Sequence, residues 1–464
     1  MTLIKSISGI RGTIGGPPAD NLTPLDAVKF AAAYGTWLKA QNPSKEKLIV
    51  VVGRDARLSG RMIQNLVMET LVGLGISIID LGLSTTPTVE IAVPLEKADG
   101  GIILTASHNP KQWNALKLLN QKGEFLDGVE GQKILEIAEQ EDFVFAEVDE
   151  LGDRVTNDAY LDIHVDEVLA LDWVESEEIR KAGFKVVVDG VNSTGGWAIP
   201  KLLKALGVEV VELYCEPTGH FPHNPEPLKE HLADICAKVV EEKADFGIVV
   251  DPDVDRLAFI SNEGEMFGEE YTLVACADYI LSKNPGPTVS NLSSSRALRD
   301  VTLQHGQEYY AAAVGEVNVV TKMKEVGAVI GGEGNGGIIY PASHYGRDAL
   351  VGTALFLMLL IEKKMSVADL RASYPAYYMS KKKIQLTPEL DVDGILKSIF
   401  ERYKKEEIST IDGVKIDFAE NWVHLRKSNT EPIIRIYTEA QSQEAADELA
   451  DRFIEELSQL AGLA

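Results

Sequence analysis

Cysteine is scarce in this sequence, and the spacing of the few present excludes two kinds of site. Cys215, Cys236 and Cys276 are the three cysteines among 464 residues, and no two of them form a Cys-x-x-Cys pair. Three well-separated cysteines do not make an even-numbered disulfide framework, and without paired spacing a zinc site is not indicated. We expect reduced thiols that behave as small, mostly buried side chains.

Positive charge is also in short supply. The chain has 45 Lys and Arg against 71 Asp and Glu, which gives a formal net charge of −26. Nucleic acids and anionic membranes are polyanions that need a basic face, so this balance argues against both as partners. The same charge would repel a sugar phosphate. Any phosphate site must therefore be a local cluster of positive groups.

Long apolar runs are absent as well. No stretch approaches the roughly 18 consecutive apolar residues that a membrane-spanning helix needs. The first residues, Met1-Thr2-Leu3-Ile4-Lys5, lack the basic segment and long apolar run of a signal peptide. We therefore predict a cytoplasmic protein.

Three long stretches of the chain repeat one pattern of secondary structure. In each, an apolar run predicts a buried strand, a helical segment follows, and a glycine precedes a second strand. The first strands are expected at 48–53, 184–190 and 287–291, and the second at 76–81, 208–214 and 307–313. The pattern predicts three similar α/β domains built on βαβ crossovers, with mixed, mostly parallel sheets.

The final part of the chain changes character. A helix is expected at 392–403, and strands are expected at 384–386, 414–418, 422–425 and 433–437. A closing helix then places Leu449, Phe453, Leu457 and Leu460 on one face. This pattern predicts a C-terminal α+β domain with an antiparallel sheet. The expected domains are 1–154, 155–260, 261–372 and 373–464.

The hexapeptide Thr105-Ala106-Ser107-His108-Asn109-Pro110 follows the apolar segment 100–104. Pro110 prevents that strand from continuing, so Ser107 lies at a strand exit. A hydroxyl needs a base or a cationic environment to act as a nucleophile, and His108 and Lys117 are both near in sequence. We hypothesise that Ser107 carries a phosphoryl group. The alternative is a simple turn, since Ser, Asn and Pro are common in turns.

Three carboxylates leave the end of another apolar run. Asp251, Asp253 and Asp255 alternate directly after the run 246–250. Clustered oxygen ligands of this kind suit Mg²⁺, whereas an EF-hand would need Gly in place of Arg256 and Glu in place of Asn262. The sequence predicts a metal site here, with a solvated acidic turn as the alternative.

Two further loops are rich in groups that bind sugars or phosphates. The glycine-rich segment 331–337 contains Glu333 and Asn335, which could hydrogen-bond sugar hydroxyls, although a glycine bulge is the alternative. The segment 426–432, followed by Arg435, could form a phosphate cradle or a polar hairpin turn. Its candidate ligands are Arg426, Lys427, Ser428, Asn429, Thr430 and Arg435.

In this order and spacing, the four loops resemble those of the α-D-phosphohexomutase family, and the resemblance covers essentially the whole chain. The matching segments are 105–110 (phosphoserine), 251–256 (metal), 332–336 (sugar) and 426–432 (phosphate), and Ser8-Gly9-Ile10-Arg11-Gly12 is similar to the family's opening element. The chain departs from the family at two places. Ala115 stands where members often have Gly, and Gly337 stands where bacterial members often have His.

The resemblance implies a mutase that moves a phosphoryl group between C1 and C6 of a hexose phosphate through a hexose 1,6-bisphosphate. Ser107 would carry the phosphoryl group and, with Asp251, Asp253 and Asp255, hold one Mg²⁺ per active site. Lys117 is the expected acid/base, which requires a lowered pKa. Arg256 or Arg11 could lower that pKa, or these arginines could instead bind phosphate. His108 would help to orient the site. Glu333, Asn335 and the cradle residues would bind substrate.

Within the family we favour glucosamine phosphate as substrate over mannose or glucose phosphate. Two other functions stay open: a phosphatase that uses water as acceptor, and a sugar-phosphate-binding protein without activity. The expected partners are small hexose phosphates, and the chain is expected to be a monomer or a homodimer.

Overall fold

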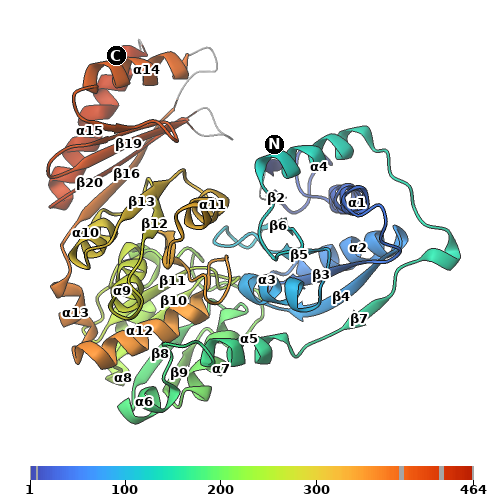
Figure 1. Cartoon of the computed structure of the whole chain (residues 1–464), viewed down its shortest axis with the longest axis horizontal. Helices are drawn as coiled ribbons and strands as arrows, with labels where there is room; N and C mark the ends of the chain where they lie inside the picture. Colours follow the sequence, from blue (N-terminus) through green and yellow to red (C-terminus); the bar gives the residue numbers. More distant parts are fainter. Residues whose placement is uncertain (1, 7–8, 386–390, 428–432, 462–464) are drawn as a thin grey trace.

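The computed structural model describes residues 2–6, 9–385, 391–427 and 433–461, and these residues form four sheets with their helices (Figure 1). The first three sheets are mixed and the fourth is wholly antiparallel within these residues. The predicted fold class, three α/β domains and a C-terminal α+β domain, is confirmed. None of the helices in these ranges is long and apolar enough to cross a membrane.

The first sheet has helices on both faces. Its strands, in spatial order, are β1 (Ile4–Ser6), β2 (Gly9–Thr13), β6 (Trp113–Leu119), β5 (Gly100–Leu104), β3 (Leu48–Arg54), β4 (Ile76–Leu83) and β7 (Arg154–Thr156). On one face lie α1 (Pro24–Gln41), α2 (Gly60–Gly73) and α4 (Gly128–Gln140), and on the other α3 (Thr86–Leu95). Because side chains alternate along a strand, Val50 and Val52 join one core and Val51 the other.

The first sheet extends past the expected domain boundary at residue 154. β7 ends at Thr156 and pairs in parallel with β4, so part of the stretch after residue 154 belongs to this sheet. Sequence alone gave little sign of the strand, because its three residues are all exposed. A 3₁₀ turn (Val148–Glu150) precedes it.

The second and third sheets share one hydrophobic core. The second has the order β11 (Leu257–Ser261), β10 (Phe246–Val250), β8 (Lys185–Asp189) and β9 (Glu209–Leu213), with helices α5 (Tyr160–Leu169), α6 (Ser176–Ala182), α7 (Gly195–Ala205) and α8 (Ala233–Glu242), and a 3₁₀ turn (Lys229–His231). The third has the order β13 (Tyr309–Ala312), β12 (Thr288–Asn291), β14 (Ile330–Glu333) and β15 (Gly337–Ile339). Its helices are α9 (Glu269–Lys283), α10 (Ala297–Gln304), α11 (Glu316–Val326), α12 (Ala349–Lys363) and α13 (Val367–Ser373).

Helix α12 joins these two domains. Phe356 on α12 stacks on Phe259 of β11 at 3.7 Å between ring centroids, inside a core that includes residues of α7 and α9. Asp348 caps α12 by accepting from the backbone nitrogens of Leu350 and Val351. The large apolar contact makes the second and third domains one packed unit.

The fourth sheet has the order β16 (Tyr378–Gln385), β20 (Ile433–Ala440), β19 (Trp422–Lys427), β18 (Val414–Asp417) and β17 (Glu407–Ser409). Helices α14 (Val392–Tyr403) and α15 (Gln443–Leu460) cover one face, where Leu449, Phe453 and Leu457 are buried as expected. β16 begins earlier than the expected strand at 384. Its lysine run, 381–383, is typical of an edge strand and hides the strand signal.

Strand ends bring the candidate loops together. Ser107 follows β5, Asp251 follows β10 and Glu333 ends β14, so each lies at the carboxyl end of a strand in a different domain. Ligands in open α/β sheets gather at these ends. The three loops meet where the first three domains face one another near the middle of Figure 1.

Candidate active site

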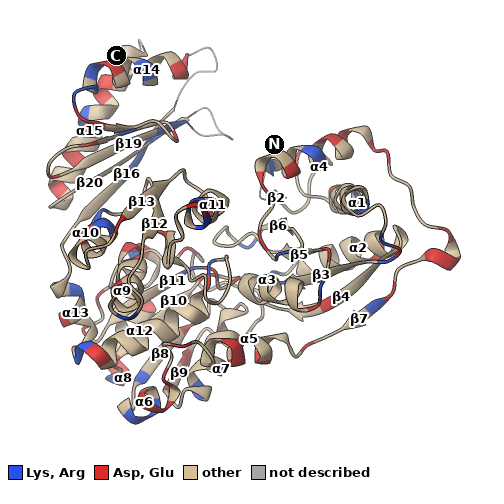
Figure 2. Cartoon of the chain, viewed as in Figure 1, with Lys and Arg blue, Asp and Glu red and all other residues tan. Residues whose placement is uncertain are grey.

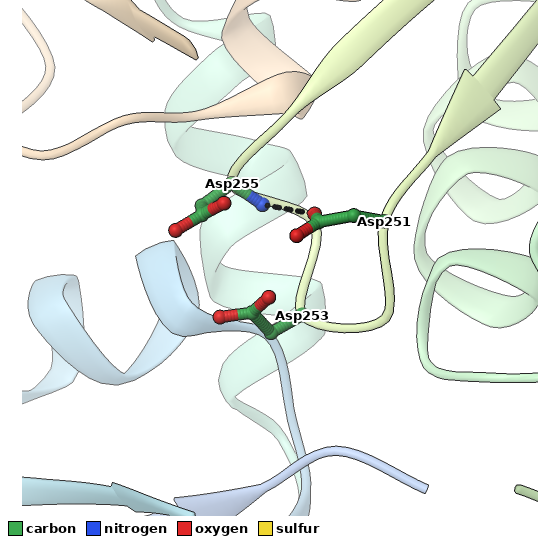
Figure 3. Close-up of side chains that lie close together, drawn as sticks. All are labelled: Asp251, Asp253 and Asp255. Carbon is green, nitrogen blue, oxygen red and sulfur yellow. Dashed lines mark hydrogen bonds between the residues drawn. The ribbon is translucent and has the colours of Figure 1, made fainter. Parts of the chain in front are cut away.

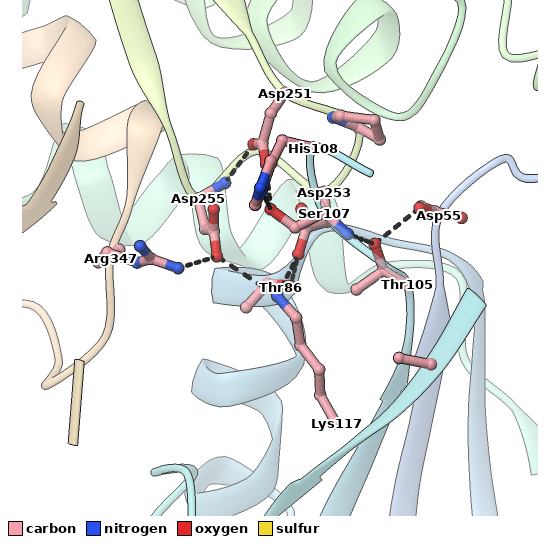
Figure 4. Close-up of polar contacts among 12 residues, drawn as sticks. Asp55, Thr86, Thr105, Ser107, His108, Lys117, Asp251, Asp253, Asp255 and Arg347 are labelled. Carbon is pink, nitrogen blue, oxygen red and sulfur yellow. Dashed lines mark hydrogen bonds and ion pairs between the residues drawn. The ribbon is translucent and has the colours of Figure 1, made fainter. Parts of the chain in front are cut away.

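Ser107 lies in a tight loop with an unusual backbone. Its φ is 48°, in the left-handed region that costs free energy for a residue with a side chain. The side chain is buried, and Oγ donates to Asp251 Oδ2 at 2.6 Å, while His108 Nδ1 lies 3.4 Å from the same Oγ (Figure 4). The loop therefore aims the hydroxyl at the loop 251–256 of the next domain, the expected metal loop.

Arg57 and Asp55 hold this loop, and the sequence analysis missed both. Arg57 donates to the backbone oxygens of Ser107 and of Asn109, Pro110 and Trp113, the last three at 2.6, 2.8 and 3.0 Å. Asp55 pairs with Arg57 Nε at 2.9 Å and accepts from Thr105 Oγ1 at 2.7 Å. The available signal was the sequence Arg54-Asp55-Ala56-Arg57 at the exit of a predicted strand.

The three aspartates form a compact, buried cluster (Figure 3). One carboxylate oxygen from each lies within 4.8 Å of the others. Asp251 Oδ1 accepts from the backbone nitrogens of Asp255 and Arg256, which fixes the loop. Burial, with Asp253 and Asp255 close by, raises the pKa of Asp251 well above its ordinary value.

Two oxygens of this cluster fit a cation. Asp253 Oδ1 and Asp255 Oδ1 are buried and have no hydrogen-bond partner, whereas Oδ2 of Asp253 accepts from Lys117 and Thr86. An unpartnered buried carboxylate oxygen is costly unless a charge meets it. Hard oxygen donors beside a serine hydroxyl suit Mg²⁺, so the residues present fit the expected ion.

Lys117 lies on β6 and reaches across to the metal loop. Its Nζ is 2.7 Å from Asp253 Oδ2 and 3.4 Å from Asp255 Oδ2. Burial alone would lower the pKa of the ammonium, but the two carboxylates outweigh burial and raise it. The expectation of a lowered pKa for Lys117 is wrong, because Asp253 and Asp255 raise it. The guanidinium that opposes them is that of Arg347 rather than Arg256 or Arg11.

His108, Arg11 and Arg256 complete the positive side of the site. Burial, helped by Arg256 and Arg11, moves the pKa of His108 well below its ordinary value, so the ring is neutral. Arg11 Nη1 donates to Asn109 Oδ1 at 3.0 Å, and Arg256 Nη1 lies 3.6 Å from a carboxylate oxygen of Glu226. Both guanidiniums therefore act electrostatically on His108, which belongs to the Ser107 loop.

The sugar loop is tied to the metal loop by a residue that the sequence analysis did not assign. Glu333 Oε1 accepts from Asn291 Nδ2 at 2.9 Å, and its Oε2 accepts from Arg347 Nη1 at 2.7 Å. Arg347 Nη2 reaches Asp255 Oδ2 at 2.6 Å (Figure 4). Asn335 Oδ1 accepts from the backbone nitrogen of Gly337 and shapes the loop.

Basic side chains of the fourth sheet form a row. Arg426 on β19 lies opposite Arg435 on β20, which lies opposite Lys383 on β16. Figure 2 marks basic residues on these neighbouring strands. Like charges directly opposite one another are unfavourable without an anion between or above them. The row is a local cluster of positive groups, of the kind that a phosphate site in this acidic chain would need, and Lys383 was not expected in it.

The rest of the phosphate cradle lies outside the described residues. Ser428, Asn429 and Thr430 fall in the range 428–432. Among the residues that the structure describes, no hydrogen bond or ion pair joins Arg426 or Arg435 to the Ser107 cluster. Arg426 Nη1 instead lies 3.4 Å from Asp412 Oδ2, which also accepts from the backbone nitrogen of Val314 in the third domain.

Four family models match successive parts of the chain. Three are described as phosphoglucomutase/phosphomannomutase alpha/beta/alpha domains I, II and III, and they match residues 3–145, 162–264 and 268–378. The fourth is the phosphoglucomutase/phosphomannomutase C-terminal domain, which matches residues 379–456. Each match corresponds to one of the four sheets, although β7 of the first sheet lies beyond the end of the first match.

Known proteins of similar length align along almost the whole chain. A phosphoglucomutase/phosphomannomutase from Thermococcus kodakarensis is 36% identical over 443 residues, 94% of this chain and 96% of the relative. A probable phosphoglucosamine mutase from Methanopyrus kandleri is 33% identical over 452 residues, 97% of this chain and 96% of the relative. A crystal structure of a phosphoglucomutase/phosphomannomutase family protein from Burkholderia thailandensis superposes with a TM-score of 0.83 at 26% identity, and covers 99% of this chain and 98% of its own.

Proposed function

The chain belongs to the phosphoglucomutase/phosphomannomutase family, and from that premise we propose that it interconverts hexose 1-phosphate and hexose 6-phosphate through a phosphorylated Ser107. The observation that supports this most directly is the 2.6 Å hydrogen bond from Ser107 Oγ to Asp251. It places a nucleophilic hydroxyl beside carboxylates that could hold a metal ion. Phosphoryl transfer needs both a positioned nucleophile and positive charge beside the transferring group.

The proposed reaction has two half-reactions. In the first, the free hydroxyl oxygen of the hexose phosphate bonds to the phosphorus on Ser107 and its proton passes to a base, while the bond from phosphorus to Oγ breaks and Oγ takes up a proton. The product is a hexose 1,6-bisphosphate. After the bisphosphate turns round, Oγ gives its proton to a base and bonds to the other phosphorus. The bond from that phosphorus to the sugar oxygen breaks and the sugar oxygen takes up a proton, which restores the phosphorylated serine and releases the isomer.

Asp251, Asp253 and Asp255, together with the phosphorylated Ser107, would hold one Mg²⁺. When bound, the ion supplies positive charge that neutralises the oxygens of the transferring group. Arg57 keeps the Ser107 loop in its strained shape, so Oγ is aimed before substrate arrives. Fixed geometry of this kind contributes to rate because the reacting atoms start close and aligned.

Lys117 and His108 are the groups that we assign to proton transfer and orientation. Lys117 Nζ contacts Asp253 in the loop 251–256, whose Asp251 accepts from Ser107, and it can serve as base in one half-reaction and as acid in the other. Its raised pKa favours the ammonium, which is the acid form. His108 is neutral and its Nδ1 faces Ser107 Oγ, so it orients the hydroxyl.

Glu333 and Asn335 are the proposed ligands for sugar hydroxyls, and the row of Arg426 and Arg435 is the proposed ligand for the phosphate that is not reacting. We assign Ser428, Asn429 and Thr430 to the same cradle. Arg11 and Arg256 would contact the reacting phosphate. One distal cradle can serve both half-reactions, because each end of the sugar occupies it in turn.

We propose glucosamine phosphate as the preferred substrate. The support for this choice is the relative from Methanopyrus kandleri, which is named a probable phosphoglucosamine mutase. The buried carboxylates Glu333 and Glu316 are both paired with Arg347, so they do not by themselves select an amino sugar. The Thermococcus kodakarensis relative is named a phosphoglucomutase/phosphomannomutase, so the names of the relatives also allow glucose or mannose phosphate as the substrate. A competition assay with the 1-phosphates of glucosamine, glucose and mannose would decide; preference for glucose or mannose phosphate would overturn the amino-sugar assignment.

The same assay separates a mutase from the two other functions. A phosphatase would release inorganic phosphate in step with substrate loss, whereas a mutase conserves it. A binding protein would do neither and would carry no phosphate on Ser107. Intact-mass measurement of wild type and Ser107→Ala tests the last point, since only the wild type should gain the mass of one phosphate.

A further inference from the structure

Arg347 lies in the segment between β15 and α12 and contacts three carboxylates of two domains. Its Nη2 is 2.6 Å from Asp255 Oδ2, its Nη1 is 2.7 Å from Glu333 Oε2, and its Nε is 3.0 Å from Glu316 Oε2. The side chain is only 9% exposed. A single planar group therefore fixes the directions of the metal loop and the sugar loop at once.

The space for this side chain comes from Gly337. A Cβ atom built on Gly337 would lie 2.2 Å from Arg347 Cδ and 3.0 Å from its Cγ. The stem of Arg347 thus crosses directly over the glycine at the start of β15. Any larger residue at 337 would have to move the arginine.

The electrostatics keep this guanidinium charged. Burial would lower its pKa, but Asp255, Glu316 and Glu333 outweigh burial and raise the pKa well above the ordinary value. Removing the charge would leave three buried carboxylates without their common partner, which is costly. Because Arg347 and Lys117 both bond to Asp255 Oδ2, the oxygen of that residue without a hydrogen bond is Oδ1, which lies 4.0 Å from Arg256 Nε.

We propose that Arg347 is a positioning residue that fixes the carboxylates of Glu333 and Asp255 relative to each other, in the space that Gly337 leaves open. The proposal rests on the proposed function in one respect, that Glu333 binds the sugar. Arg347 itself touches neither the reacting phosphorus nor Ser107 in the described contacts. It acts through the two carboxylates, and Gly337 acts through Arg347.

A purely structural role makes a different prediction. The second and third domains already share a large apolar core through α12, so Arg347 is not the main link between them. If it only stabilised that interface, substitutions would lower the melting temperature and leave substrate affinity alone. If it positions Glu333, substrate affinity must change in the folded protein.

The test uses Arg347→Lys, Gly337→Ala and the double variant. Lysine keeps the charge but cannot reach both carboxylates with one planar group. Gly337→Ala removes no charge and contacts neither carboxylate of the pair, yet it should displace Arg347; its φ is not in the left-handed region, so alanine suits the backbone. Arg371→Lys is the matched control, since Arg371 lies in the same domain, stacks on Tyr271 and is bound to Phe267 O.

Two readouts are needed for each folded variant. Calorimetry measures the Kd of hexose 6-phosphate in chelator-treated protein, and steady-state kinetics gives KM and kcat. Arg347→Lys and Gly337→Ala should each weaken binding and raise KM by about tenfold or more, the size of a lost charged hydrogen bond. The double variant should be no worse than the worse single one, because both changes act on one side chain. Arg371→Lys should leave Kd and KM unchanged.

Unchanged Kd and KM in folded Gly337→Ala would overturn the proposal, as would effects of the two single changes that multiply in the double variant. If Arg347→Lys fails to fold, Gly337→Ala still decides the matter. Failure of the proposed function would look different. The wild type would then bind hexose phosphate without converting it, and the calorimetric comparison would remain valid.

Discussion

Ser107 Oγ donates a hydrogen bond to Asp251 Oδ2 at 2.6 Å, although the two residues are 144 positions apart and belong to different domains. The contact joins the end of β5 to the end of β10. Because Oγ already lies against the acidic cluster, a phosphoryl group on Ser107 would lie beside the carboxylate oxygens that fit a cation. The proposed nucleophile and the proposed metal site are therefore parts of one centre.

Ser107→Ala should abolish mutase turnover and leave the fold intact. The change removes the nucleophilic oxygen and no core volume, so the melting temperature should stay close to that of the wild type. Steady-state kinetics and a thermal melt check the two halves of this prediction. Turnover at the wild-type rate would show that the phosphoryl group is carried elsewhere.

Asp253→Asn should raise the Mg²⁺ concentration needed for half-maximal activity. The amide retains an oxygen but removes a charge that attracts the ion. Asp245→Asn is a suitable control, because Asp245 flanks β10 at its other end and accepts only from the backbone nitrogen of Lys185 among its described contacts. An identical Mg²⁺ titration for Asp253→Asn and the control would move the metal site away from this loop.

Arg57→Lys should lower kcat by about tenfold or more with a smaller effect on KM. Lysine cannot donate to all four backbone carbonyls that Arg57 binds, and a small displacement of the nucleophile lowers the rate of the chemical step. Arg54→Lys tests for a general effect of changing this segment, since Arg54 bonds to Gln64 and to Asp55 O outside the Ser107 loop. Equal kcat values for both variants would reduce Arg57 to a structural role.

Arg426→Ala should raise KM for the 1-phosphate and the 6-phosphate together, with a smaller fall in kcat. A lost charged hydrogen bond is worth about 1.5 to 3 kcal/mol, or roughly ten- to a hundredfold in binding. Arg452→Ala in the same domain is the control, because Arg452 stacks on Phe418 and Phe453 rather than joining the basic row. A rise in KM for only one isomer would mean that the cradle binds the sugar phosphate in one orientation only, and it would contradict the shared-cradle mechanism.

Ionisation of the buried carboxyl of Glu270 should lower the free energy of unfolding as pH rises. Burial raises the pKa of its carboxyl to about 8 despite the nearby Lys381, against 4.5 ordinarily. Between pH 4.5 and about 8 the folded chain holds a proton that the unfolded chain has released, so the free energy of unfolding falls with increasing pH. The carboxyl also lies against Gly334, so its charge state bears on the sugar loop.

Urea unfolding of Glu270→Gln at several pH values measures this effect. The variant cannot ionise at this position, so its stability should fall less than that of the wild type between pH 5 and 8. Glu269→Gln is the matched control, because it removes the neighbouring, more exposed carboxyl. If Glu270→Gln and the wild type lose stability in parallel, the buried carboxyl is not responsible.

The sequence predicted the fold class and the members of the central cluster for local reasons. Apolar runs of five or six residues mark the strands β3, β5 and β10, and proline or alternating aspartates mark the loops that follow them. Ser107, Asp251, Asp253 and Asp255 are recognisable because each loop is a short, continuous segment.

Contacts between distant segments could be decided only by the tertiary structure. Arg57 holds the Ser107 loop from the end of another strand, and Arg347 joins Asp255 to Glu333 over Gly337; in the sequence these arginines look like ordinary charged residues. The pKa of Lys117 was mispredicted for the same reason, because its sign depends on which charges lie nearest in space. Sequence determined the chemistry that each loop carries, through local composition and strand periodicity. Tertiary packing determined which loops meet and which charges they share, because Coulomb and hydrogen-bond energies depend on distances in space and not on separation along the chain.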